Sequence, residues 1–281
     1  NCCCRQCDDE GSGTHPSITP DEMVSRLLKG GQISATTAKA LDRINDEDLS
    51  PRDYAEKIAK LVREGKLSPK EAQKLMATYA KSHGEDVDSP AGVTDQLLAS
   101  GAITPRTARE LDAMSHADIS PSAYAGKLAQ LVKDGKITPA EAKKLMRAYE
   151  RSRGEYNAVD GSTPDGLTNQ LEASGAITPQ TAEALHQLNQ ANLPPAAYAK
   201  ALKKLVEEGK LSPSEASALL KSYVHSHDQK QADGRGAPKT GPANALLSQL
   251  VHGGNITPQT AKALASLMHQ HVPLGVFDKK L

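Results

Sequence analysis

The segment Gly-Lys-Leu-Ser-Pro at residues 65–69 recurs as Gly-Lys-Ile-Thr-Pro at 135–139 and again as Gly-Lys-Leu-Ser-Pro at 209–213. Its glycine can close a preceding helix in the left-handed conformation, its hydroxyl residue can cap the next helix, and its proline fits the first turn of that helix. A glutamate two residues after each proline completes a capping box with the serine or threonine. The segment therefore predicts a helix-turn-helix junction that occurs three times in the chain.

A second glycine signal, Gly-x-Ile followed by serine or threonine, precedes each junction and also begins a fourth, incomplete copy. The distance between the two signals is 34 residues in every complete copy, because 65 − 31, 135 − 101 and 209 − 175 are equal. From copy to copy the spacing grows from 70 to 74 to 79 residues, so insertions fall outside the copies. Folded units with tolerant linkers behave in this way. The glycines of the second signal are Gly31, Gly101, Gly175 and Gly254.

Each copy also resembles itself in halves, as a helical hairpin that has been doubled. After the first junction, Ala72, Leu75, Met76 and Tyr79 follow the spacing of a helix with one apolar face. We therefore expect an all-α fold of tandem small four-helix modules joined by flexible linkers, with at least about 60% helix. The drifting spacing predicts beads on a string that fold separately and couple weakly, with any rigid stacking limited to the first two modules.

The predicted domain boundaries follow the repeat. The last copy stops before its second hairpin is complete, and the first residue is Asn1 rather than methionine, so we expect both ends to be cuts in a longer polypeptide. The predicted segments are 1–18, cysteine-rich and disordered; 19–81, 93–153 and 167–225, the three complete modules; 226–244, a disordered linker with almost no apolar residue to bury; and 245–281, a truncated fourth module.

Composition and motifs exclude several classes of function. Lysine plus arginine and aspartate plus glutamate both number 34, so the formal net charge is zero, whereas a protein that tracks nucleic-acid phosphates carries a basic surplus. No run approaches the ~18 consecutive apolar residues of a membrane span. No catalytic triad, paired-carboxylate set or glycine-rich phosphate loop recurs in the modules. The sequence therefore predicts no enzyme, no cofactor, no small-molecule substrate and no nucleic-acid partner.

Six of the seven tyrosines occupy two recurring positions. Such regularity predicts that their rings fill the cores of small modules while their hydroxyl groups reach the rim. The alternative is a stacking surface for bases or sugars. The recurring tyrosines are Tyr54, Tyr124 and Tyr198 at one position, and Tyr79, Tyr149 and Tyr223 at the other.

Two patterns resemble metal sites and have plainer explanations. The stretch 134–137 with Glu141 matches part of a calcium loop, but Gln130 and Val132 stand where oxygen ligands are needed, and a helix cap explains the same residues. Two His-x-His pairs would place their rings on different faces of a helix, without a cysteine or carboxylate at ligand spacing, so we expect them to be solvated. These pairs are His225 with His227 and His269 with His271.

The four cysteines lie within six residues near the start of the chain. They are too close together in sequence to cross-link the modules through disulfides, and a zinc site usually needs two separated pairs of cysteines. Three interpretations stay open: S-acylation or lipid attachment beside a preceding membrane segment, surface thiols without function, and a metal site. These candidate lipidation sites or reactive thiols are Cys2, Cys3, Cys4 and Cys7.

Two resemblances to known families bear on function. The half-module from Leu131 to Leu145 resembles the SHOCT type of short bacterial helical hairpin, which is an oligomerisation or docking element. The longer pattern from Tyr198 to Tyr223 resembles repeat regions of membrane-anchored components of type IVB (Dot/Icm-like) bacterial secretion systems, and it covers nearly all of 19–281. This resemblance implies a scaffold that binds protein partners in a larger, membrane-associated assembly of the bacterial cell envelope, with no substrate chemistry. The cysteine cluster favours proximity to the membrane through the N-terminal side.

A rival resemblance comes from residues 175–190. This stretch is similar to the small helical domains that bind peptidoglycan, although Leu188-Asn-Gln190 stands where those domains usually end in Phe-Gln. It implies an alternative function, in which helical modules of a cell-envelope protein bind peptidoglycan.

Overall fold

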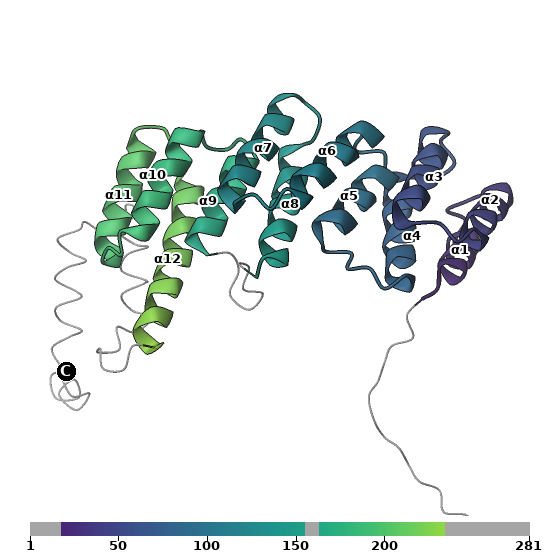
Figure 1. Ribbon diagram of the computed structural model, residues 1–281, viewed down its shortest axis with the longest axis horizontal. Helices are drawn as coiled ribbons and strands as arrows, with labels where there is room; N and C mark the ends of the chain where they lie inside the picture. The colour runs from purple at the N-terminus through teal and green to yellow at the C-terminus, as the bar shows by residue number, and fades with distance from the viewer. Residues whose placement is uncertain (1–17, 155–162, 234–281) are drawn as a thin grey trace, which may run out of the picture. The chain divides into compact units, whose positions relative to one another are not determined.

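The computed structural model describes residues 18–154 and 163–233, which form twelve helices and contain no strand (Figure 1). The all-α class predicted from the sequence is confirmed. Eleven of the twelve helices begin at a proline, whose fixed φ and missing N–H suit the first turn. The helices are α1 (Pro20–Lys29), α2 (Ala35–Asp46), α3 (Pro51–Arg63), α4 (Pro69–Ser82), α5 (Pro90–Ala99), α6 (Pro105–His116), α7 (Pro121–Lys133), α8 (Pro139–Ser152), α9 (Pro164–Ala173), α10 (Pro179–Gln190), α11 (Pro195–Glu207) and α12 (Pro213–Asp233).

In sequence the helices make three repeats of four: repeat one is α1–α4, repeat two is α5–α8 and repeat three is α9–α12. In space they group into two compact units, Asn1–Ala108 and Arg109–Leu281, with the boundary inside α6. In the first unit α1 packs against α2 and α4, α3 packs against α4, and α5 lies against both α3 and α4. The second unit follows the same order, because α9 lies against α7 and α8 and also against α10 and α12.

The three junctions predicted from the sequence adopt the expected geometry. Gly65, Gly135 and Gly209 have φ values of 69°, 69° and 68°, in the left-handed region. At the first junction the Lys66 N–H donates to the Leu61 carbonyl at 2.9 Å, which closes the helix in the Schellman manner. All three capping boxes form, and in each the glutamate carboxylate accepts the N–H of the capping residue at 2.8 or 2.9 Å.

Gly135→Val is expected to lower the free energy of unfolding by about 2 kcal/mol, because a β-branched residue strongly disfavours the left-handed region. A Cβ built on Gly135 meets no atom within 4 Å, so the effect isolates the backbone conformation from packing. Urea unfolding followed by far-ultraviolet circular dichroism measures it, with Lys127→Ala on the exposed side of α7 as the control. Equal unfolding midpoints for the two variants would count against the left-handed cap.

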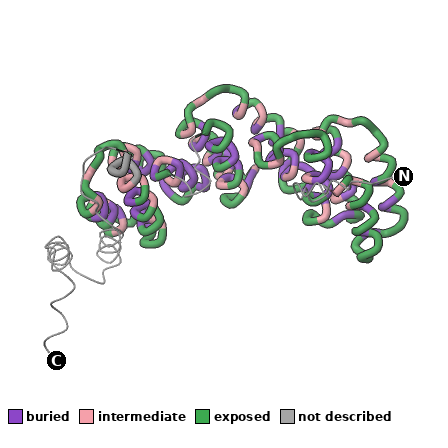
Figure 2. The backbone as a smooth tube through the Cα atoms, turned by 90° about the horizontal axis from the view of Figure 1, so that it is seen from below, coloured by how far each residue is buried: buried purple, intermediate pink, exposed green. Residues whose placement is uncertain are grey.

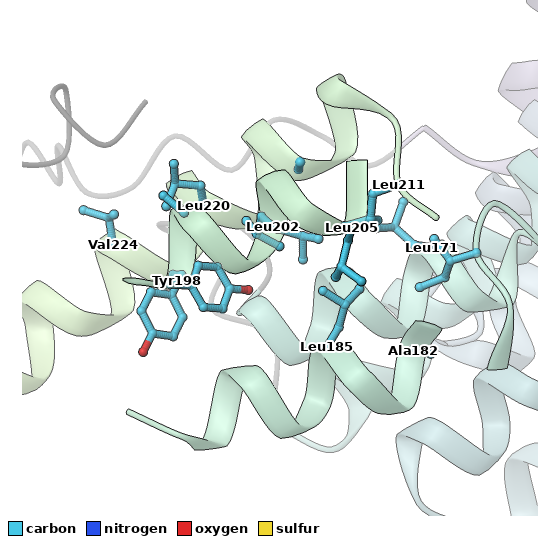
Figure 3. Packing of buried hydrophobic residues seen from close by; sticks show 14 residues of the cluster. Leu171, Ala182, Leu185, Tyr198, Leu202, Leu205, Leu211, Leu220 and Val224 are labelled. Carbon is cyan, nitrogen blue, oxygen red and sulfur yellow. The ribbon is translucent and has the colours of Figure 1, made fainter. Parts of the chain in front are cut away.

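Six tyrosines form three stacked pairs, one in each repeat. Their ring centres are 3.7–3.9 Å apart, their planes lie within 8° of parallel, and each residue is at most 5% exposed. Figure 3 shows Tyr198 of the third pair beside apolar residues of the same cluster, among them Leu202 and Leu220. The second tyrosine of each pair donates its hydroxyl to a backbone carbonyl in the loop before α3, α7 or α11. The predicted core role of the tyrosines is therefore confirmed. The pairs are Tyr54–Tyr79, Tyr124–Tyr149 and Tyr198–Tyr223.

The first helix of repeats two and three is buried nearly all round, whereas α1 is buried on one side. Eight of the ten residues of α5 and of α9 are buried, against two of the ten in α1. Figure 2 colours the described residues of the chain by how far each is buried. Leu98 in α5 is 0% exposed, while Leu28, at the same place in α1, is 40% exposed. The Arg52 Nε atom on α3 also donates to Asp95 on α5 at 2.5 Å. The preceding repeat therefore covers α5.

This packing differs from the weakly coupled beads expected from the spacing of the repeats. The connection between α4 and α5 is 7 residues long (83–89), and that between α8 and α9 is 11 residues long (153–163). Their difference of 4 equals the growth in spacing from 70 to 74, so the inserted residues lie in a connection between helices. A longer connection leaves the packing faces of the helices unchanged. Drift in repeat spacing is therefore compatible with packing between repeats.

Three helix ends differ from the predicted boundaries of the modules. Helix α5 begins at Pro90 rather than near 93, because the Ser89 hydroxyl caps it by accepting the Gly92 N–H at 3.0 Å. Helix α9 likewise begins at Pro164, before the predicted module start at 167. Helix α12 continues through 226–233, where a disordered linker was expected, since neither glycine nor proline interrupts it between its first residue and position 234. The cysteine-rich segment 1–17 and the truncated fourth module lie outside the described residues.

Candidate functional site

A chain of polar side chains joins three helices of repeat three beside its tyrosine pair. Asp165, in the first turn of α9, accepts a hydrogen bond from Asn189 Nδ2 at 2.8 Å. Asn189, near the end of α10, accepts the hydroxyl of Tyr198 on α11 at 2.6 Å. His186 Nδ1 lies 2.9 Å from the same oxygen of Asp165. These bonds satisfy the polar end of a buried ring and hold α9, α10 and α11 together.

Repeat one contains the same polar chain, and repeat two does not. Asn45 donates to Asp21 at 2.9 Å and accepts the hydroxyl of the buried Tyr54 at 3.0 Å. In repeat two the corresponding residues are Ala91 and Ser115, and Ser115 Oγ lies 3.4 Å from the tyrosine hydroxyl. This chain of polar side chains is therefore present in repeats one and three.

A hollow of about 230 Å³ opens beside this polar chain in the second unit. Its walls come from the start of α9, the end of α10 and the middle of α12, which are distant in sequence. Among the described residues that line it, Asp165 is the acidic one, and none is lysine or arginine. The Asp165 side chain is 49% exposed, so part of its carboxylate faces solvent. The lining residues are Thr163–Asp165, Asn189, Asn192, Tyr223, Ser226 and His227.

Repeat two holds an arginine at the corresponding place. The Arg153 Nη1 atom donates to Asp118 Oδ1 at 2.7 Å, and the guanidinium carbon lies 5.7 Å from the centre of the Tyr149 ring. Counting along the repeats aligns Arg153 with His227 and Asp118 with Asn192, since both pairs are 74 residues apart. Asp118 and Asn192 share a left-handed backbone, with φ values of 45° and 46°. The two repeats therefore present the same local framework with different side chains.

The contact of α9 with α7 and α8 contains buried carboxyl groups. Glu150 on α8 is 1% exposed and accepts Gln170 Nε2 at 3.2 Å. Glu172 on α9 occupies the place of Leu98 in α5, and its Oε1 lies 3.6 Å from where a Cβ of Gly126 on α7 would stand. Burial raises the pKa of the Glu172 carboxyl above its usual range, and the nearby His186 partly opposes this. A Cβ at position 126 would therefore stand in ordinary van der Waals contact with the Glu172 carboxyl group.

The stability that Tyr124 contributes is expected to fall as the pH rises from about 10 to about 12. Burial raises the pKa of its hydroxyl to about 12, while in the unfolded chain the usual value of about 10 applies. Because the folded pKa is the higher one, the contribution is fully present below the unfolded pKa and is lost as the pH rises through the folded pKa. Melting temperatures across this range should decline less steeply in Tyr124→Phe, and identical slopes would contradict the assignment.

The structure places the candidate metal-binding residues from the sequence in different surroundings. His225 is exposed, whereas His227 borders the hollow with its ring centre 6.1 Å from that of Tyr223. Glu141 accepts the Thr138 N–H at 2.8 Å, as the helix-cap interpretation predicts. Within residues 18–154 and 163–233, no three histidine, cysteine or acidic side chains are grouped so that they could hold a metal ion. Cys2, Cys3, Cys4, Cys7, His269 and His271 lie outside the described part of the chain.

The polar chain and the hollow were not predicted from the sequence. The available signal was the recurrence of an Asp and an Asn at one fixed distance, because 165 − 21 and 189 − 45 are both 144.

No protein-family model, curated protein or solved structure matches this chain. None of the helices in the described residues is long and apolar enough to cross a membrane. The fold and the site together define an all-α protein with a repeat-like helical structure and a polar hollow in its third sequence repeat.

Proposed function

We propose that this chain is a non-catalytic scaffold whose helical repeats bind protein partners in a larger assembly. The observation that supports the proposal is the contrast between the interior and the surface of the repeats. Caps, closing glycines and tyrosine pairs recur, whereas one exposed position is Arg63, Lys133 and Glu207 in successive repeats. Repeat proteins commonly bind through variable surface residues on a constant framework, and no repeated reactive set accompanies the framework here.

The assembly that we propose is membrane-associated and bacterial, and it is a secretion apparatus of the type IVB kind. The support is the resemblance of the 198–223 pattern to repeat regions of membrane-anchored components of such systems, and of 131–145 to SHOCT hairpins. In this proposal the N-terminal side lies near the membrane, and Cys2, Cys3, Cys4 and Cys7 are candidates for lipid attachment. The repeats then present their exposed faces to protein partners.

Site-specific photo-cross-linking in the native bacterium tests this proposal. A photoreactive residue placed at exposed positions of α3, α7 and α11, including Arg63, Lys133 and Glu207, reports which faces touch another protein. The expected result is cross-linking to envelope proteins from some exposed faces and little from others, because a scaffold has defined contact faces. Uniform absence of protein cross-links at all positions would contradict the scaffold.

Peptidoglycan binding is the second candidate, and one observation favours it. Asn189 lies in the stretch 175–190 that is similar to peptidoglycan-binding domains, and it also lines the hollow. Sedimentation of the purified chain with bare sacculi separates the two candidates. Retention of the chain on the sacculi near stoichiometric levels would make peptidoglycan binding the favoured function. Recovery of the chain in the supernatant favours the protein scaffold.

A further inference from the structure

His227 borders the polar hollow of repeat three, and the corresponding residue of repeat two is an arginine, Arg153. In repeat two the Arg153 guanidinium is held by Asp118 and lies beside the Tyr149 ring. A guanidinium between a carboxylate and an aromatic ring combines a charge-assisted hydrogen bond with a cation–π contact. Repeat two therefore shows which chemical group this framework accommodates.

Repeat three keeps the framework and replaces the arginine. His227 stands in the place of Arg153, and its shorter side chain borders a hollow of about 230 Å³. Tyr223 keeps the place of Tyr149 and lines the hollow, with its hydroxyl bonded to the Leu193 carbonyl at 2.8 Å. The hollow therefore lies where repeat three has a shorter side chain than repeat two at the same position.

The carboxylate of repeat three stands at a different position from the carboxylate of repeat two. Asn192 replaces Asp118, while Asp165 stands where repeat two has Ala91. Side-chain oxygens of Asn192, Ser226 and Thr163 are further hydrogen-bond acceptors among the lining residues. One half-exposed carboxylate, several neutral acceptors and an absence of lysine and arginine from the described lining favour a cation with many donors.

We propose that this hollow binds the guanidinium of an arginine side chain from a protein partner. The proposal rests on the proposed scaffold function and names one of its contact points. A planar guanidinium presents five N–H donors in a fixed arrangement, which can bond to several acceptors around the wall of the hollow at once. A lysine ammonium is a compact, strongly hydrated charge with three donors, and it fits such a wall less well.

Titration of the full chain with N-acetyl-arginine amide, followed by NMR, tests the proposal without any knowledge of the partner. The expected result is saturable shifts of the Asn192, Tyr223 and His227 resonances at millimolar ligand, as befits a single small group. The neutral isostere N-acetyl-citrulline amide should bind about tenfold more weakly, because it loses the charge-assisted hydrogen bond. N-acetyl-lysine amide should also bind more weakly than the arginine compound.

His227→Arg is the matched variant, because it gives repeat three the residue that repeat two already has. The new arginine should fill the hollow, abolish the response to N-acetyl-arginine amide and leave the far-ultraviolet circular dichroism spectrum unchanged. Asp165→Asn should weaken the response by about tenfold while conserving size. Equal binding of citrulline or lysine amide, or an unchanged response in a folded His227→Arg chain, would overturn the proposal. Cross-linking in the bacterium tests the scaffold separately, so failure of one is distinguishable from failure of the other.

Discussion

Leu98→Ala is expected to lower the free energy of unfolding by about 2–5 kcal/mol, the range found when a buried leucine is truncated in a close-packed core. Leu98 is 0% exposed on a helix that packs against α3 and α4 of the preceding repeat. The residue at its place in α9, Glu172, faces α7, which indicates that position 98 faces α3. Urea unfolding of the full chain measures the loss.

Leu28→Ala is the matched control for this substitution. It removes the same atoms from the same helical position, but Leu28 is 40% exposed in α1. The expected change is therefore within about 0.5 kcal/mol of zero. Similar losses in the two variants would mean that burial between repeats does not stabilise α5.

Tyr198→Ala is expected to cost about 3–5 kcal/mol, because it empties the space of a buried aromatic ring. The ring is 0% exposed and stacks on Tyr223 with centres 3.7 Å apart. Truncation also removes the hydroxyl that Asn189 accepts at 2.6 Å, so the polar chain to Asp165 loses one end. Thermal unfolding of the full chain is the measurement.

Tyr198→Phe separates the ring from its hydroxyl. It keeps the stacked ring and removes one hydrogen bond, so the expected loss is about 1 kcal/mol. A loss as large as that of the alanine variant would assign most of the stability to the polar chain rather than to packing. A negligible loss in the alanine variant would contradict the core role of the tyrosine pair.

Local signals in the sequence were sufficient for the helices, their caps and the tyrosine cores. A left-handed glycine followed by a capping hydroxyl, a proline and a glutamate satisfies all of its requirements within about seven residues, so no tertiary context is needed to recognise it. The two tyrosine positions recur with the same signals, and their burial follows from regular spacing on an apolar helix face. These features were correctly predicted because their physics is local.

Packing between repeats could not be predicted from the same signals. Leu28 and Leu98 are identical residues at equivalent positions, and they differ in burial because one follows another repeat in the described structure and the other does not. A hint lay in Gly166 of α9, where a Cβ would come within 3.2 Å of Glu150 Oε1 on α8, while the corresponding residue in α1 is Glu22. The growing spacing between repeats reports the length of the connections, and this length does not determine how closely the repeats pack.

The hollow required three segments that are distant in sequence. Asp165, Asn189 and Tyr223 come from α9, α10 and α12, and their proximity depends on how two hairpins cross. The recurrence of the Asp and the Asn in repeat one was visible, but it did not distinguish a structural polar chain from a binding site. The difference between Arg153 and His227 indicates a binding site only when the hollow beside His227 is known.

The first helix of repeats two and three completes the packing of the repeat before it. Native-state hydrogen exchange on the full chain, with and without Leu98→Ala, tests this coupling. We predict that the substitution speeds amide exchange in α3 and α4 as well as in α5, while Leu28→Ala leaves all three unchanged. Faster exchange confined to α5, with α3 and α4 protected as in the parent, would show that the repeats are independent and would contradict the account.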